Sequence, residues 1–136
     1  MNSEFFGELQ YEENAEWYTC NFDYLGLPIE LSIDSENEKV DLKAAENIIN
    51  ALVSRNIEIK EYIEQEYYPL YKQTWAPILF KASRKNFKKR LEPNGIVIYV
   101  TGELDVYFND GGLFKGHDVV VRFDKEQGFY NARLSG

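Results

Sequence analysis

The sequence predicts an α+β fold in which helices pack on one face of an antiparallel sheet. Two regions, residues 5–33 and 96–134, alternate apolar and polar residues with the period of two that is typical of strands. Between them, apolar residues recur at three- and four-residue steps, which is the helical period. The elements therefore follow the order strands, helices, strands, without strand-helix alternation. This order is typical of α+β proteins. The expected sheet has three N-terminal strands and a four-strand C-terminal meander, with one long and one or two short helices.

The N-terminal strands are expected at residues 5–12, 18–24 and 27–33. The second and third form a hairpin that turns at Gly26. Because Pro28 has no backbone N–H, it belongs at a sheet edge or among the first residues of its strand. Cys20 shares the alternating face of Tyr18 and Phe22, so we expect it to be a small buried hydrophobe.

A long amphipathic helix is predicted from the N-cap Asp41 to Tyr67. Asn56 falls on its apolar stripe, where a polar side chain needs a partner or marks a bend. Pro69 disfavours helical geometry at Tyr68, so we expect the helix to kink or restart there.

A shorter helix is predicted to begin at Ser83 and to end before a turn at residues 93–95. The C-terminal meander then occupies residues 96–100, 104–108, 119–123 and 129–134, with glycine-containing turns between the strands. At 136 residues, the chain is expected to form a single domain over residues 1–136.

The charge of the chain is unevenly distributed. Residues 1–66 hold 16 acids and 4 bases, whereas residues 67–136 hold 7 acids and 11 bases, which divides the net charge of −8 into −12 and +4. An excess of negative charge disfavours nucleic acid and anionic membranes as partners. We find no secretory signal or membrane-spanning stretch, and the single cysteine permits no intrachain disulfide, so we expect a cytoplasmic protein.

His117, the only histidine, is the first residue to weigh for catalysis. It ends the loop 111–117, beside Asp110 and Asp118, and we expect its imidazole to hydrogen-bond the loop backbone. The alternative, a small ligand-binding protein or enzyme that uses the Gly111–His117 loop with His117 as base, stays open. One histidine and one cysteine cannot form a zinc site, so no metal, cofactor or catalytic residue is predicted.

Two charged surfaces are expected on the helices. The basic residues around the second helix could bind an anion, but the pattern favours a solubilising face paired with glutamates; they are Lys81, Arg84, Lys85, Lys88, Lys89 and Arg90. The acidic face of the long helix could steer a basic partner.

The last third of the chain combines the helix at Phe87 with the loop Asp110–His117 and the ending 132–136. This order resembles a bacterial family of unknown function, the one numbered 2262, whose pattern includes an acidic-Gly-x-Leu-Phe-x-Gly-His loop. Lys115 stands where that family usually has an aromatic residue. The resemblance, which extends to the long helix, implies an α+β fold and a bacterial cytoplasmic protein. Small acidic members of such families resemble immunity proteins that neutralise toxins.

We therefore expect a non-catalytic protein that binds a protein partner, in particular a bacterial immunity protein that neutralises a basic toxin domain. The predicted partner-binding residues are Glu58, Glu61, Glu64, Tyr68, Tyr71, Phe114 and His117. A third alternative is a homo-oligomer that assembles through a bare strand edge or through Tyr67, Tyr68 and Tyr71.

Overall fold

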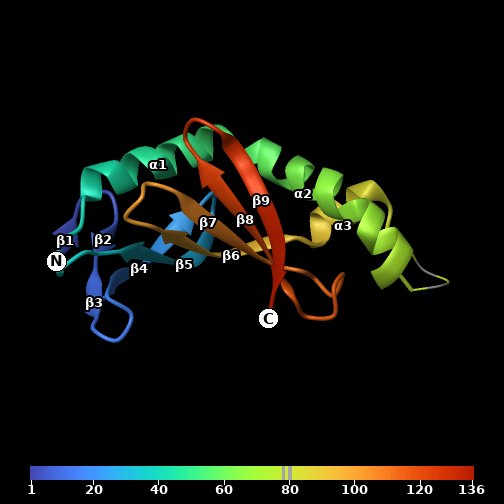
Figure 1. Ribbon diagram of the computed structural model, residues 1–136, viewed down its shortest axis with the longest axis horizontal. Helices are drawn as coiled ribbons and strands as arrows, with labels where there is room; N and C mark the ends of the chain where they lie inside the picture. The colour runs from blue at the N-terminus through green and yellow to red at the C-terminus, as the bar shows by residue number, and fades with distance from the viewer. Residues whose placement is uncertain (78, 80) are drawn as a thin grey trace.

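The computed structural model describes residues 1–77, 79 and 81–136, and it places the helices across one face of a twisted sheet (Figure 1). The strands are β1 (Asn2–Ser3), β2 (Gly7–Glu8), β3 (Gln10–Glu12), β4 (Trp17–Tyr24), β5 (Leu27–Asp34), β6 (Glu92–Ile98), β7 (Leu104–Asn109), β8 (Asp118–Asp124) and β9 (Gly128–Ser135). The helices are α1 (Leu42–Ser54), α2 (Asn56–Leu70), the π-helical turn η1 (Tyr71–Trp75) and α3 (Arg84–Arg90). The predicted α+β class is confirmed.

The main sheet of the described residues has seven strands in the order β3-β4-β5-β6-β7-β8-β9. The β4–β5 hairpin and the C-terminal meander are as predicted. One pair departs from the antiparallel pattern, because β5 and β6 run parallel. The helices lie between these two strands in the chain, and a helical crossover brings a strand back in the same direction.

The predicted first strand is wrong over its first half. Residues Gly7–Glu8 pair with β1 in a separate two-stranded sheet, and only Gln10–Glu12 pairs with β4. Phe6 and Leu9 are both buried, although they are three positions apart and would face opposite sides of a straight strand. The chain therefore turns between them, and the Leu9 amide donates to the Met1 carbonyl.

The turn predicted at residues 93–95 is also wrong, because these residues lie inside β6. The pairing of β6 with β7 is irregular between Pro93 and Gly95. A bulge of this kind accommodates a proline, which cannot donate to the sheet.

The predicted long helix is divided at Arg55 into α1 and α2. The partner expected for Asn56 is found, since its side-chain amide donates to the Val53 carbonyl at 2.6 Å, and the helix is interrupted next to it. The helix does not restart at Pro69. Helix α2 continues through it to Leu70, and the wider η1 turn follows. The predicted N-cap Asp41 is confirmed, since its carboxylate accepts from the Ala44 amide. The second helix begins at Ser83 as predicted, and the Ser83 hydroxyl accepts from the Asn86 amide.

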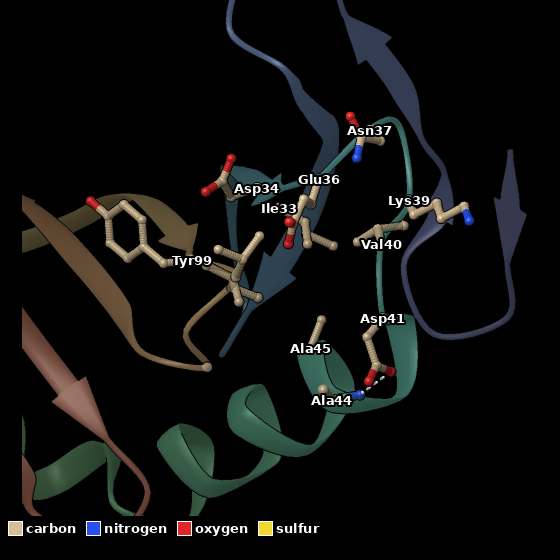
Figure 2. A pocket seen from close by; sticks show the side chains of 13 residues that line it. Ile33, Asp34, Glu36, Asn37, Lys39, Val40, Asp41, Ala44, Ala45 and Tyr99 are labelled. Carbon is tan, nitrogen blue, oxygen red and sulfur yellow. Dashed lines mark hydrogen bonds between the residues drawn. The ribbon is translucent and has the colours of Figure 1, made fainter.

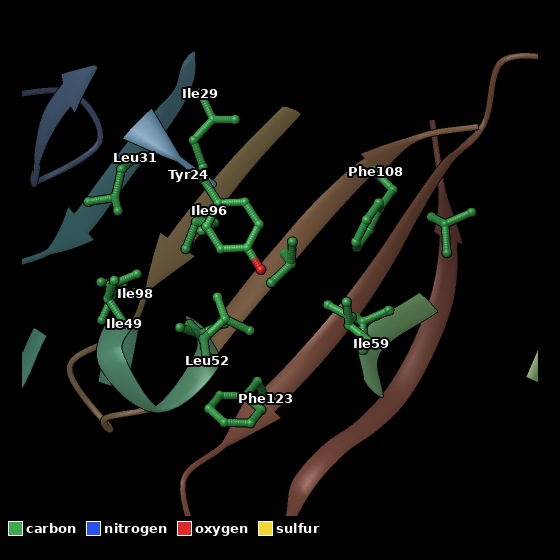
Figure 3. Packing of buried hydrophobic residues seen from close by; sticks show 14 of the residues in the cluster. Tyr24, Ile29, Leu31, Ile49, Leu52, Ile59, Ile96, Ile98, Phe108 and Phe123 are labelled. Atoms are coloured by element: carbon green, nitrogen blue, oxygen red, sulfur yellow. The ribbon is translucent and has the colours of Figure 1, made fainter. Parts of the chain in front are cut away.

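The core lies between the helices and the sheet (Figure 3). It contains Ile49, Leu52, Ile59 and Ile63 from the helices and Leu31, Ile96, Val106 and Phe123 from the strands, each at most 3 % exposed. Burial of each such side chain contributes roughly 1.5–3 kcal/mol. Cys20 is buried, as predicted. Within the described part of the chain, no helix combines the length and apolar character needed to cross a membrane.

Candidate functional site

The loop between β7 and β8 is organised by the carboxylate of Asp110, which is 4 % exposed. Its oxygens accept hydrogen bonds from the amides of Gly112, Phe114 and Gly116 at 2.8–3.1 Å. The loop also packs tightly against α3. A Cβ atom on Gly111 would lie 2.4 Å from the carbonyl oxygen of Arg90. Asp110 therefore bonds the loop backbone, a role that the sequence analysis assigned to His117.

His117 is half-buried, and its ring meets Trp75 edge-on at 5.7 Å between centroids. A general base needs a carboxylate or a nucleophile within hydrogen-bond reach, and the oxygens of Asp110 are already bonded to the loop. Over residues 1–77, 79 and 81–136, no group of three or more His, Cys, Asp or Glu is arranged to hold a metal ion. The bonds from the loop amides to Asp110 give the loop the geometry of a structural element.

Three of the predicted partner-binding residues lie in the core. Tyr68, Tyr71 and Phe114 are 7 %, 1 % and 0 % exposed and pack around Phe87. The Tyr68 hydroxyl donates to the Ala82 carbonyl, and the Tyr71 hydroxyl accepts from the Ala82 amide. In this conformation they hold α3 against α2 and present no contact surface.

The predicted glutamates lie in different environments. Glu58 is exposed and pairs with Arg55 at 2.8 Å, and Glu61 is exposed. Glu64 pairs with both Arg84 and Lys88 at 3.1 Å. These hydrogen bonds lower the pKa of the Glu64 carboxyl. The expected pairing of the basic helix with glutamates is thus found for Arg84 and Lys88.

A strand edge was another predicted contact, and α2 covers part of it. The hydroxyl of Tyr67 donates to the carbonyl of Ala132 in the edge strand β9 at 3.0 Å. A helix that occupies an edge carbonyl reduces the tendency of that edge to pair with another sheet.

An ion network that was not predicted from the sequence lies on the sheet face turned away from the helices. Asp105, with no exposed surface, accepts bonds from Arg122 (2.9 and 3.1 Å), Arg133 (2.8 Å) and Tyr99 (2.7 Å). The Arg122 guanidinium also lies over the Tyr99 ring, at 5.1 Å from its centroid. Tyr130 extends the network by donating to Glu103.

Desolvation raises the pKa of Asp105, but the bonds from Arg122, Arg133 and Tyr99 outweigh it, so the net pKa lies below its ordinary value. The carboxylate is therefore charged and bonded on both oxygens, which makes it a structural anchor for β7, β8 and β9. One feature of the sequence indicates this network. Asp105 and Arg122 occupy polar positions of neighbouring alternating strands, and they are cross-strand partners in the sheet.

An acidic pocket of about 460 Å³ lies at the start of α1 (Figure 2). Asp34, Glu36 and Asp41 line it, together with Lys39. Its outer wall is the turn 36–39, in which Asn37 and Glu38 have left-handed φ of 53° and 63°. Left-handed residues other than glycine carry a conformational cost, and such residues are enriched at functional sites.

A second acidic groove, of about 690 Å³, runs along β3 and β4. Glu8, Glu12 and Glu30 line it without any basic residue, and half-buried Trp17 contributes an aromatic surface. Both hollows are built by residues 6–45 together with the β6–β7 turn, at the end of the molecule that carries the N-terminus (Figure 1). We call these two hollows the acidic end.

Residues 3–134 match the model of a family described as an uncharacterized protein conserved in bacteria, numbered 2262. The chain belongs to this family. No curated protein and no solved structure shows a significant match.

The family match covers nearly the whole chain, which confirms the resemblance found in the sequence. In this member of family 2262, the loop that carries the resemblance and the acidic end both fall within the matched residues. That description names no activity, so the evidence for a function is the geometry of the chain itself.

Proposed function

We propose that this member of family 2262 is a non-catalytic binding protein that receives a basic protein partner at its acidic end. The first candidate partner is a toxin domain, which would make the chain a bacterial immunity protein. A cytoplasmic location belongs to the same proposal, and a fold that needs no disulfide supports it.

The observation that carries the proposal is the set of uncompensated carboxylates at the acidic end. None of Glu8, Glu12 and Glu30 forms an ion pair with the residues that the structure describes. The basic helix α3 lies toward the other end of the long axis (Figure 1). Because the two charges are separated, the acidic end keeps its negative field and can steer a cationic surface toward it.

Trp17 is the aromatic anchor that such a contact would use. It lines the acidic groove and is half-buried, so a partner can cover the rest of its ring. Interfaces draw much of their affinity from a few aromatic or arginine residues surrounded by polar contacts. Trp17 would take the role for which Tyr68, Tyr71 and Phe114 are too deeply buried.

The test is affinity capture from the source bacterium with three forms of the full chain. The first is wild type, the second carries Glu8→Lys, Glu12→Lys and Glu30→Lys, and the third is the control Glu61→Lys with Glu66→Lys. The control reverses exposed charges on α2 and so also tests the surface predicted from the sequence.

We expect wild type and the control to retain the same basic protein at low salt, and the groove variant to lose it. Added salt should weaken the wild-type complex about tenfold or more between 50 and 300 mM. Equal retention by all three forms would refute the acidic end as the contact. Retention of no basic protein at low salt would refute the proposal as a whole.

A further inference from the structure

A pocket of about 470 Å³ lies between the β4–β5 turn, the start of α2, and α3, away from the acidic end. Its apolar wall includes Ile59 and Phe108, and Tyr24 lines it from the end of β4 (Figure 3). The volume is within the usual range for small-molecule sites, roughly 300–1,000 Å³.

The rim of this pocket exposes large apolar side chains. Leu25 is 55 % and Ile57 is 75 % exposed, although most residues of this type in the chain are buried. Leu25 also has a left-handed φ of 53°, a conformation that disfavours a branched residue. The two-residue turn Leu25–Gly26 of the β4–β5 hairpin requires this left-handed φ, but it does not require the exposure of Leu25 and Ile57. Exposed apolar side chains at the rim of a pocket are typical of contact with a ligand.

The polar lining is cationic. It contains Lys60, Lys85, Lys88 and Lys89 against the single carboxylate of Glu61, in a chain whose net charge is −8. Lys88 pairs with a glutamate outside the pocket, whereas the other three lysines form no ion pair within the described residues.

The environment of Lys60 adds to the case for an anionic ligand. Burial lowers the pKa of Lys60, which means that its ammonium group is poorly solvated where it stands, and the charge of Glu92 offsets this in part. An anionic group beside Lys60 would compensate for this lost solvation.

We propose that this pocket binds a small amphiphilic anion, that is, an apolar chain or ring that carries one carboxylate or phosphate group. The apolar part covers Leu25 and Ile57, and the anionic group lies among the lysines. A small ligand fits better than a protein surface, because the site is concave and its exposed apolar rim is limited to these two side chains.

The experiment titrates the isotope-labelled full chain by NMR with octanoate, octyl phosphate, 1-octanol and inorganic phosphate. We expect either amphiphilic anion to shift the amides around the pocket, and 1-octanol and phosphate each to bind about tenfold weaker or more. The relative affinity of octanoate and octyl phosphate identifies the preferred head group. Binding of 1-octanol as tight as that of octanoate would overturn the proposal, as would the absence of saturable shifts with both anions.

Substitutions distinguish the contribution of the lysine charges to ligand binding from that of the apolar side chains. Lys85→Gln with Lys89→Gln should weaken octanoate binding about tenfold and leave 1-octanol unchanged, because these lysines act on the head group. Ile57→Ser should weaken both ligands, whereas Val100→Ser, at an exposed apolar residue of the acidic end, should weaken neither.

Phosphatidylglycerol vesicles test the competing explanation of a basic membrane-binding surface. The proposal would be overturned if wild type sediments with the vesicles, the Lys85→Gln, Lys89→Gln variant does not, and the soluble anions give no response. That result would favour a membrane-binding surface. The charge-reversed acidic-groove variant should bind octanoate as wild type does, so that this inference and the proposed function can fail independently.

Discussion

The substitution Asp105→Asn tests the ion network under the outer face of the sheet. Asparagine keeps the shape of the side chain but removes its charge, and its amide group donates where the carboxylate accepted. Arg122, Arg133 and Tyr99 all donate to Asp105 in the wild type. In the variant, at least one of these donors meets another donor, and both guanidinium groups lose their buried counter-ion.

The loss of unfolding free energy in Asp105→Asn can be estimated from the burial of the two arginine partners. Removing one member of a buried ion pair costs about 3–5 kcal/mol. The lower end applies, because the side chains of Arg122 and Arg133 are 29 % and 38 % exposed and can recover part of their hydration. With an unfolding entropy of about 2.1 cal/mol/K per residue, a chain of 136 residues should lose about 10 °C in Tm for about 3 kcal/mol.

Urea unfolding of wild type, Asp105→Asn and the exposed-site control Glu126→Gln, followed by circular dichroism, measures this difference. The control should lie within about 0.5 kcal/mol of wild type. Because folding lowers the pKa of Asp105, its contribution is complete above its unfolded pKa of about 3.9 and is lost as the pH falls through the lower folded value. The difference between wild type and variant should therefore be constant from pH 5 to 8 and shrink below about pH 4. A deficit under about 1 kcal/mol at pH 7 would refute the reasoning, since it would mean that both arginines are fully rehydrated.

Three further outcomes follow from the geometry. Gly111→Ala should lower the free energy of urea unfolding by about 3 kcal/mol, because the new Cβ would meet Arg90. Gly112→Ala, which has a left-handed φ but open space around it, should lower it by about 1 kcal/mol. Equal losses in the two variants would contradict the contact with Arg90. Burial raises the pKa of the Cys20 thiol to about 11, so its reaction with a disulfide reagent at pH 8 should be at least about tenfold slower in the folded than in the unfolded chain. Asp41→Ala should remove the N-cap bond of α1 and about 1 kcal/mol of stability, which the same unfolding assay would detect.

The elements that the sequence predicted correctly are those specified by local patterns. The hairpin at Gly26, the cap at Asp41, the helix start at Ser83 and the partner of Asn56 each depend on a few neighbouring residues. The errors occur where a distant contact overrides the local preference. Residues 93–95 have the composition of a turn, yet pairing with both β5 and β7 draws them into a strand.

The sites divide in the same way. The excess of acids in the first half and the cluster of bases around α3 are properties of composition, so they were evident before the fold was known. The tyrosines at the end of α2 were expected to be accessible, but their burial depends on α3 and on the loop 110–117 packing over them.

The sequence by itself therefore determined the types of the main elements, most of their order and the sign of the charge in each half of the chain, because periodicity, capping and composition act over short stretches of chain. Only the tertiary structure decided that Asp105 meets Arg122 and Arg133, and that Tyr24, Ile57 and Lys85 surround one pocket. Those residues are separated by 17 or more positions, and their encounter is set by strand register and helix packing, which no local pattern encodes.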